Sequence, residues 1–182
     1  MKNLIILFTT LFLSVLISCA NNQESQNLNS FANGEIAITL GGEPRTLDPT
    51  LNSLSFGSIY MIHFFEGLTK RDIKDNVVPG MAESWDISKD GLKYTFHLRT
   101  NAKWSDGKPV VASDFEYAIK RAANPETGAS YSHMLNVIKN ASLVISGKAE
   151  VDDLQVKALD DYTLEIVLEN PAPYFLEYIS VS

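Results

Sequence analysis

The sequence predicts an α/β fold, with an α+β mixed sheet that is at least partly antiparallel. Three observations indicate it. Residues 94–98 alternate apolar and polar side chains, a pattern typical of a half-buried strand. The same alternation on both sides of Asp160-Asp161 predicts a hairpin, because adjacent acidic residues favour a turn in water. Apolar residues at helical spacing after Ser113 predict an amphipathic helix.

Composition limits the classes of function. The chain has 182 residues, of which 45% are hydrophobic and 20% charged, as expected for one globular domain or one domain plus a fragment. The net charge is −7, and the basic residues form only isolated pairs such as Lys70-Arg71 and Lys120-Arg121. Nucleic acid is not expected as a partner, because phosphate binding needs a basic surface.

The first residues predict export. Residues 1–18 combine Lys2 with an apolar stretch too short for a stable membrane span, which is typical of a signal peptide. Residues 16–19 (LISC) resemble a bacterial lipobox, so the Cys19 thiol is expected to carry a diacylglycerol that anchors the protein to a membrane. The alternative is an ordinary signal peptide that contains a cysteine. With no second cysteine, no internal disulfide is possible.

The next elements follow in order along the chain. Residues 19–34 hold Cys19 and a stretch rich in Asn, Gln and Ser, which predicts a flexible tether. Residues 36–40 alternate as a short strand. Residues 58–68 carry apolar side chains at helical spacing and on most sides, so this helix is expected to be largely buried. Residues 77–80 (VVPG) predict a loop.

The central helix has predicted ends. Ser113 and Glu116 have the spacing of a capping box, in which each side chain bonds the other residue's backbone amide. The helix is expected to end at Asn124-Pro125, because the residue before a proline disfavours the helical region. Residues 131–147 predict a second, interrupted helix.

No constellation of residues indicates catalysis. His63, His97 and His133 are 34 and 36 residues apart, so none has the close partner that metal sites show. The sequence contains no nucleophile elbow, P-loop or dinucleotide-binding glycine fingerprint. We therefore expect no metal, no cofactor and no catalytic residue, which leaves a binding function by elimination.

Several blocks of sequence resemble one family, the bacterial extracellular solute-binding proteins of the oligopeptide/dipeptide type (family 5), and the oligopeptide-binding type most closely. The likeness covers nearly everything from residue 35 onward, in order. Its blocks are residues 43–49 (EPRTLDP), 65–68 (FEGL), 79–85 (PGMAESW), 94–117 (YTFHLRTNAKWSDGKPVVASDFEY), 156–164 (VKALDDYTL) and 171–175 (PAPYF). The block at 94–117 is highly specific.

The resemblance implies a periplasmic-binding-protein type II-like fold, in which two lobes enclose the ligand and the first carries an extra domain. Residues 35–64 would begin the ligand-facing lobe. Residues 65–182 would form most of the extra domain, so that the chain is the amino-terminal part only and stops before the second lobe. The implied partners are peptides and the permease subunits of an ABC transporter, at the periplasmic or extracellular face of the cell envelope.

The resemblance also implies ligand contacts. One is an extended stretch that pairs its main chain with the bound peptide; it comprises Asn52, Ser53, Leu54, Ser55 and Phe56. Such pairing gives affinity without reading side chains. The other is Tyr131, which matches an aromatic position that touches ligand, unless it packs on its own domain.

Other functions stay open at this stage. The chain would be a folded but inactive gene remnant if the gene is interrupted, or a surface lipoprotein that binds a protein partner. An enzyme is the last option. Because a cleft needs both walls to bury a ligand, residues 1–182 alone are expected to bind peptides weakly or not at all.

Overall fold

The computed structural model describes residues 42–180. The predicted signal peptide, Cys19, the tether and the strand at 36–40 lie outside these residues. The described residues belong to the unit that begins at residue 41.

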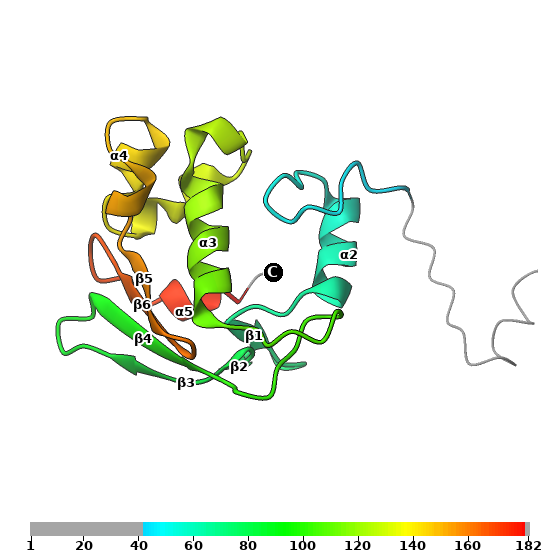
Figure 1. Cartoon of the computed structure of the whole chain (residues 1–182), viewed down its shortest axis with the longest axis horizontal. Coiled ribbons are helices and arrows are strands. Elements are labelled where there is room, and N and C mark those ends of the chain that lie inside the picture. Colours follow the sequence, from blue (N-terminus) through cyan, green and yellow to red (C-terminus); the bar gives the residue numbers. More distant parts are fainter. Residues whose placement is uncertain (1–41, 181–182) are drawn as a thin grey trace, which may run out of the picture. The chain divides into compact units, whose positions relative to one another are not determined.

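An antiparallel sheet of four strands forms the centre of the fold (Figure 1). Its strands occur in the order β3-β4-β6-β5, and every pairing among the described strands is antiparallel. Their bounds are Ala82–Ile87 for β3, Lys93–Leu98 for β4, Val156–Asp160 for β5 and Thr163–Val167 for β6. This arrangement confirms the predicted antiparallel character of the sheet and the hairpin at Asp160-Asp161.

Helices pack on one face of this sheet. The longest is α3 (Ala112–Ala123), which packs against β5 and β6. The interrupted helix predicted for 131–147 is confirmed as two pieces, η3 and α4. The other short elements are η2 (Pro125–Thr127), η3 (Ser132–Val137), α4 (Ala141–Ile145), η4 (Val151–Asp153) and α5 (Phe175–Tyr178).

The core lies between the sheet and these helices. Phe96 of β4 is fully buried opposite Leu164 of β6, as the alternating pattern predicts. Tyr94 donates its hydroxyl to the Ala172 carbonyl at 3.3 Å, and its ring meets the Phe175 ring edge-on at 4.8 Å between centroids. Burial of these aromatic rings supplies much of the apolar area that stabilises the domain. We call residues 68–180 the sheet domain.

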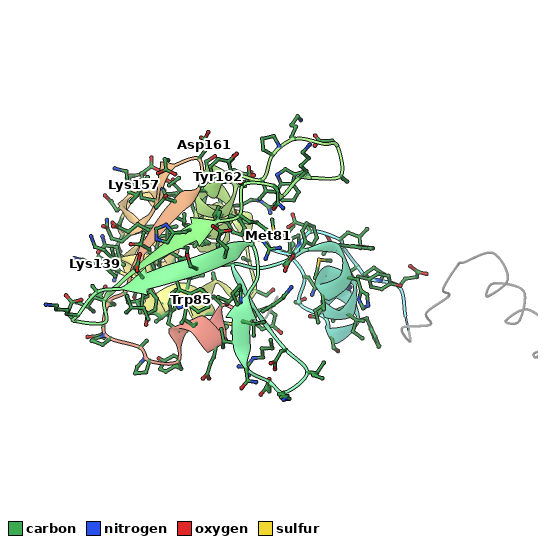
Figure 2. All side chains as sticks on the ribbon, turned by 90° about the horizontal axis from the view of Figure 1, so that it is seen from below. Met81, Trp85, Lys139, Lys157, Asp161 and Tyr162 are labelled. Carbon is green, nitrogen blue, oxygen red and sulfur yellow. The ribbon has the colours of Figure 1, made fainter. Side chains whose placement is uncertain are left out.

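The turn between β5 and β6 also fixes the start of α3. The Asp161 carbonyl accepts a hydrogen bond from the Ala112 amide at 2.8 Å, and the Tyr162 carbonyl accepts one from Leu98 at 2.7 Å. Figure 2 labels Asp161 and Tyr162 at this turn, and Trp85 on β3. The hairpin tip therefore serves as a structural junction between the sheet and α3.

A second, two-stranded sheet corrects one prediction. Residues 77–80 were expected to be a loop, but Val77–Pro79 form β2, paired with β1 (Thr69–Arg71). The proline is accepted because a strand of this small ribbon has a free edge. The buried Thr69 hydroxyl donates to the Leu176 carbonyl at 3.1 Å, which joins the ribbon to α5.

The predicted capping box is wrong. Helix α3 begins at Ala112, and its first turn is closed by Asp114, whose carboxylate accepts the Val111 amide at 3.0 Å. Glu116 instead accepts the Ala158 amide of β5 at 2.7 Å. That strand has a register shift after Ala158, and Glu116 satisfies the amide at the irregularity. The predicted end of the helix at Asn124 is confirmed.

Candidate ligand-binding site

The segment that contains the predicted ligand contacts begins with a tight turn built by Asp48. We call residues 46–54 the turn segment. The Asp48 amide donates to Thr46 Oγ1 at 3.0 Å, and Asp48 Oδ1 accepts the Thr50 amide at 2.9 Å. The Asp48 carbonyl accepts the amides of Leu51 and Asn52 at 3.2 and 3.1 Å. An aspartate favours such a turn because its short side chain bonds nearby backbone.

Asn52 connects this turn to α2 (Ser55–Phe64). Its Nδ2 donates to Ser58 Oγ at 3.1 Å, and its Oδ1 accepts the Leu54 amide at 3.3 Å. The carboxamide occupies the space beside Gly57, where a Cβ atom would lie 1.9 Å from Asn52 Oδ1. The Asn52 side chain and amide are therefore engaged within the chain, and its carbonyl is the group without a partner among the described residues.

The start of α2 corrects the predicted extended stretch. Leu54 has extended backbone angles, φ −115° and ψ 140°, but Ser55 and Phe56 form the first turn of the helix. A peptide cannot pair with these two residues as with a strand. The first amides of a helix have no partner within it, however, so Ser55 and Phe56 present N–H groups of a different geometry.

The turn segment is joined to α3 by an ion pair. Arg121, in the last turn of α3, donates through Nη1 and Nη2 to the two Asp48 carboxylate oxygens at 2.9 and 2.5 Å. This hydrogen bonding lowers the pKa of Asp48 below its ordinary value, although burial acts in the opposite direction. Figure 1 shows the turn segment, drawn in blue to cyan, beside the carboxyl end of α3.

Tyr131 lies near the same end of α3. After α3 the chain passes through η2, where Asn124 Oδ1 accepts the Glu126 amide at 3.0 Å, and Gly128 takes a positive φ of 68°. Tyr131 follows immediately before η3, and its side chain is 53% exposed. The Asp48–Arg121 pair thus joins the first predicted contact region to the last turn of α3, and Tyr131, the second, follows that helix along the chain and is exposed.

The predicted burial of the helix after Asn52 is wrong. Only Gly57 and Met61 of α2 are buried among the residues described, while Ile62 and Phe64 are 61% and 59% exposed. On its inner side, a cavity of about 550 Å³ lies between α2 and the sheet domain, lined by Met61, Phe65, Trp104, Phe115 and Phe175 among others. An uncharged helix with exposed apolar faces is typical of an interaction surface.

Neither a metal site nor a membrane span is found in the part that the structure covers. Across residues 42–180, no three His, Cys, Asp or Glu side chains gather closely enough to hold a metal ion. None of the helices in the same range is both long and apolar enough to cross a bilayer. The candidate site consists of backbone groups, the hydrogen-bonded Asn52 side chain, the Asp48–Arg121 ion pair and the exposed Tyr131. Groups of this kind can bind a ligand through hydrogen bonds and ring contacts.

Comparison with known proteins identifies the class as a solute-binding protein. The chain belongs to the family described as "Bacterial extracellular solute-binding proteins, family 5 Middle", which matches residues 76–182. This confirms the resemblance seen in the sequence.

Individual relatives agree. The dipeptide-binding protein DppE of Bacillus subtilis is 39% identical over 173 residues, which make up 91% of this chain and 32% of the relative. A solved structure, the substrate-binding domain of an oligopeptide ABC transporter from Bacillus anthracis, is 43% identical. It superposes with a TM-score of 0.73 over 74% of this chain and 26% of that one.

Another solved relative carries a peptide. Haemophilus influenzae OppA in complex with RPPGFSPFR is 40% identical, with a TM-score of 0.72 over 75% of this chain and 27% of that one. The predicted fold class is therefore confirmed. The chain spans about a third or less of the length of these relatives.

Proposed function

We propose that this protein is the peptide-binding component of an ABC importer, which captures oligopeptides and delivers them to the permease subunits. The observation that carries the proposal is the agreement in both sequence and fold with dipeptide- and oligopeptide-binding proteins. A relative solved with RPPGFSPFR supports a peptide as the ligand. In this role the protein performs no chemistry on the peptide, so no catalytic group, metal or cofactor is required.

In this proposal the peptide lies along the turn segment and the start of α2. Within Asn52, Ser53 and Leu54, its main chain pairs with the groups that have no partner among the described residues, which are the Asn52 carbonyl and the amide and carbonyl of Ser53. The Leu54 amide and carbonyl are already bound by Asn52 and Ser58. The free amides of Ser55 and Phe56 then bind carbonyl or carboxylate oxygens, which helix amino termini favour. Tyr131 contacts the ligand through its exposed ring. Binding through backbone groups suits a carrier of many peptide sequences.

Calorimetry tests the proposal directly. The protein is purified from the membranes of its own cells and titrated with a mixed pool of tri- to pentapeptides. We expect saturable binding that Tyr131→Ala weakens and Tyr174→Ala leaves unchanged, since Tyr174 has a similar exposure, 58% against 53%, but lies before α5. Absence of binding by the unaltered protein to every peptide in the pool would refute the function.

The domain organisation belongs to the same proposal. Residues 35–64 begin the ligand-facing lobe, and residues 65–182 form most of the extra domain. Support comes from the core, since the large buried side chains are contributed by the sheet domain. A cleft needs two walls, so residues 19–182 expressed without a second lobe should bind peptides more weakly than about 1 mM, in contrast to the protein purified from its own cells. Calorimetry with the same peptide pool measures this.

We further propose that the protein is held at the cell envelope by a lipid on Cys19, after removal of residues 1–18, with residues 19–34 as the tether. The lipobox-like sequence and the extracellular family support this location. Labelled palmitate should be incorporated into the unaltered protein and sediment with membranes. A Cys19→Ala variant that keeps both the label and the membrane location would contradict the anchor.

A further inference from the structure

The turn segment is held in place without buried apolar anchors. Not one of residues 46–54 is buried, and Leu47 and Leu51 are largely exposed. The cavity between α2 and the sheet domain shows that packing across this boundary is incomplete. Apolar burial, which fixes the strands of the sheet domain, therefore contributes little to the position of this segment.

Polar contacts take over that role, and they converge on one residue. Among residues 42–180, the hydrogen bonds of the turn segment stay within residues 46–58, except for the two from Arg121 to Asp48. Arg121 is thus the single described hydrogen-bond partner from the sheet domain. Its paired donors fix orientation as well as distance, because a guanidinium and a carboxylate meet in one plane.

The position of Arg121 is itself well fixed. It lies in the last turn of α3, which packs against β5 and β6, and Ala123 of the same turn is fully buried. Tyr131 follows the same end of α3 along the chain, after the turn bounded by Asn124 and Gly128. The turn segment is therefore bonded to a rigid helix, and Tyr131 comes shortly after that helix in the chain.

We propose that the Asp48–Arg121 ion pair is the latch that holds the turn segment at a set distance from Tyr131. The inference rests on the proposed function, in which both regions contact one peptide. Asp48 and Arg121 act as positioning residues, because they support the contact groups without touching the ligand. Opening the latch would leave the fold intact and loosen the segment, so a peptide would have to order it on binding.

Hydrogen exchange in the absence of peptide tests the latch. Arg121→Met should raise amide exchange across residues 46–58 by about tenfold or more, because local opening becomes easier, while β4 and β6 exchange as before. Lys120→Met is the matched control. It removes the same charge from the same helical turn and leaves Asp48 and its partner untouched, so residues 46–58 should not change.

A second variant guards against a folding defect. Asp48→Asn keeps an oxygen for the Thr50 amide but loses the ion pair, so it should loosen the same residues. In the unaltered protein, protection of residues 46–58 should also fall as the pH drops through the lowered pKa of Asp48, and Arg121→Met should weaken that dependence, leaving only the part due to the Thr50 and Leu51 amides. Equal exchange in residues 46–58 of the unaltered and Arg121→Met proteins would overturn the latch.

Peptide titration then separates the latch from the function. Arg121→Met should weaken peptide binding about tenfold with little change in Tm, whereas Lys120→Met should bind normally. An unchanged affinity in a variant with faster exchange would overturn the positioning role. Failure of the unaltered protein to bind any peptide would refute the proposed function alone, since the exchange result does not depend on a ligand.

Discussion

Phe96, at the centre of the sheet, and Asn52, in the turn before α2, are both held by their neighbours, but the neighbours differ in kind. Phe96 is fully buried among apolar side chains from several strands and helices. Asn52 makes two side-chain hydrogen bonds, both to residues within six positions along the chain. The sheet domain is thus stabilised by long-range burial, and the turn segment by short-range polar bonds plus one ion pair.

This difference has a functional meaning. A close-packed core resists change at any one position and gives a rigid support. A segment held by hydrogen bonds keeps its backbone near the surface, where a peptide can reach it, and opens at a lower free energy. In the proposed function, the molecule combines a rigid support with a contact surface that a ligand can order.

The largest expected effect is in the core. Phe96→Ala should lower the free energy of unfolding by about 3–5 kcal/mol, because it removes a buried ring and leaves a cavity. Urea denaturation monitored by circular dichroism measures the change. A loss below about 1 kcal/mol would mean that the core rearranges to fill the space, and the contrast between the two regions would weaken.

The next effect is local to α2. In Gly57→Ala the new Cβ atom would lie 1.9 Å from Asn52 Oδ1, so the carboxamide must move and lose its hydrogen bonds. We expect local opening of α2 to become easier by about 1–2 kcal/mol, even though alanine favours a helix by up to about 1 kcal/mol. Hydrogen exchange of residues 52–61 provides the measurement.

Two matched variants make that test sharper. In an Asn52→Ala background the clash disappears, so Gly57→Ala should become stabilising. Gly42→Ala should be neutral, because its Cβ atom would meet the Phe56 ring at an ordinary 3.6 Å. If Gly57→Ala destabilises α2 equally with and without Asn52, the hydrogen bonds of the Asn52 side chain are not what fixes the helix.

The sequence predicted the two regions unequally well. The period-two pattern at Tyr94, Phe96 and Leu98 identified β4, because one face of that strand is buried. In α2 the same reasoning failed, since an apolar composition predicts burial while the described residues cover only Gly57 and Met61. The composition of a helix shows which of its side chains could be buried, but the residues that pack against the helix determine which side chains are buried.

Contacts between distant residues explain the other misses. Glu116 fits the capping-box spacing, yet it bonds Ala158, 42 residues away, and no local pattern reveals that choice. Asp48 and Arg121 are 73 residues apart, so no local sequence pattern predicts their pairing. The family resemblance predicted residues 52–56 and Tyr131 as ligand contacts, but only the fold shows the Asp48–Arg121 pair that joins the turn segment to α3.

A smaller effect tests an ion pair inside the sheet domain. Burial raises the pKa of Glu116, but the Ala158 amide and Lys120 outweigh it, so the pKa lies below its ordinary value. The group therefore stabilises the fold fully above about pH 4.3, the ordinary glutamate pKa, and its contribution is lost as the pH falls through the lowered value.

Replacing the carboxylate isolates this contribution. Glu116→Gln should cost about 1–2 kcal/mol at pH 7 and flatten the loss of stability on acidification, because an amide does not titrate. Asp152→Asn is the control. It removes the other partner of Lys120, and because the Asp152 side chain is 92% exposed, the change should cost little stability. Parallel pH profiles for Glu116→Gln and the unaltered protein would contradict the assignment.

The smallest effect is expected at the tip between β1 and β2, which belongs to the sheet domain but is built like the turn segment. Asp72 accepts the amides of Lys74 and Asn76 at 2.8 and 2.9 Å, whereas Ile73 is 102% exposed and touches no core residue. Ile73→Ser should change the free energy of unfolding by less than about 0.5 kcal/mol. Asp72→Ala should open the tip, seen as faster exchange of Lys74 and Asn76 with the core unaffected. A large loss of stability in Ile73→Ser would show that this side chain is covered in the native protein, and local polar bonds would then not suffice to hold an exposed turn.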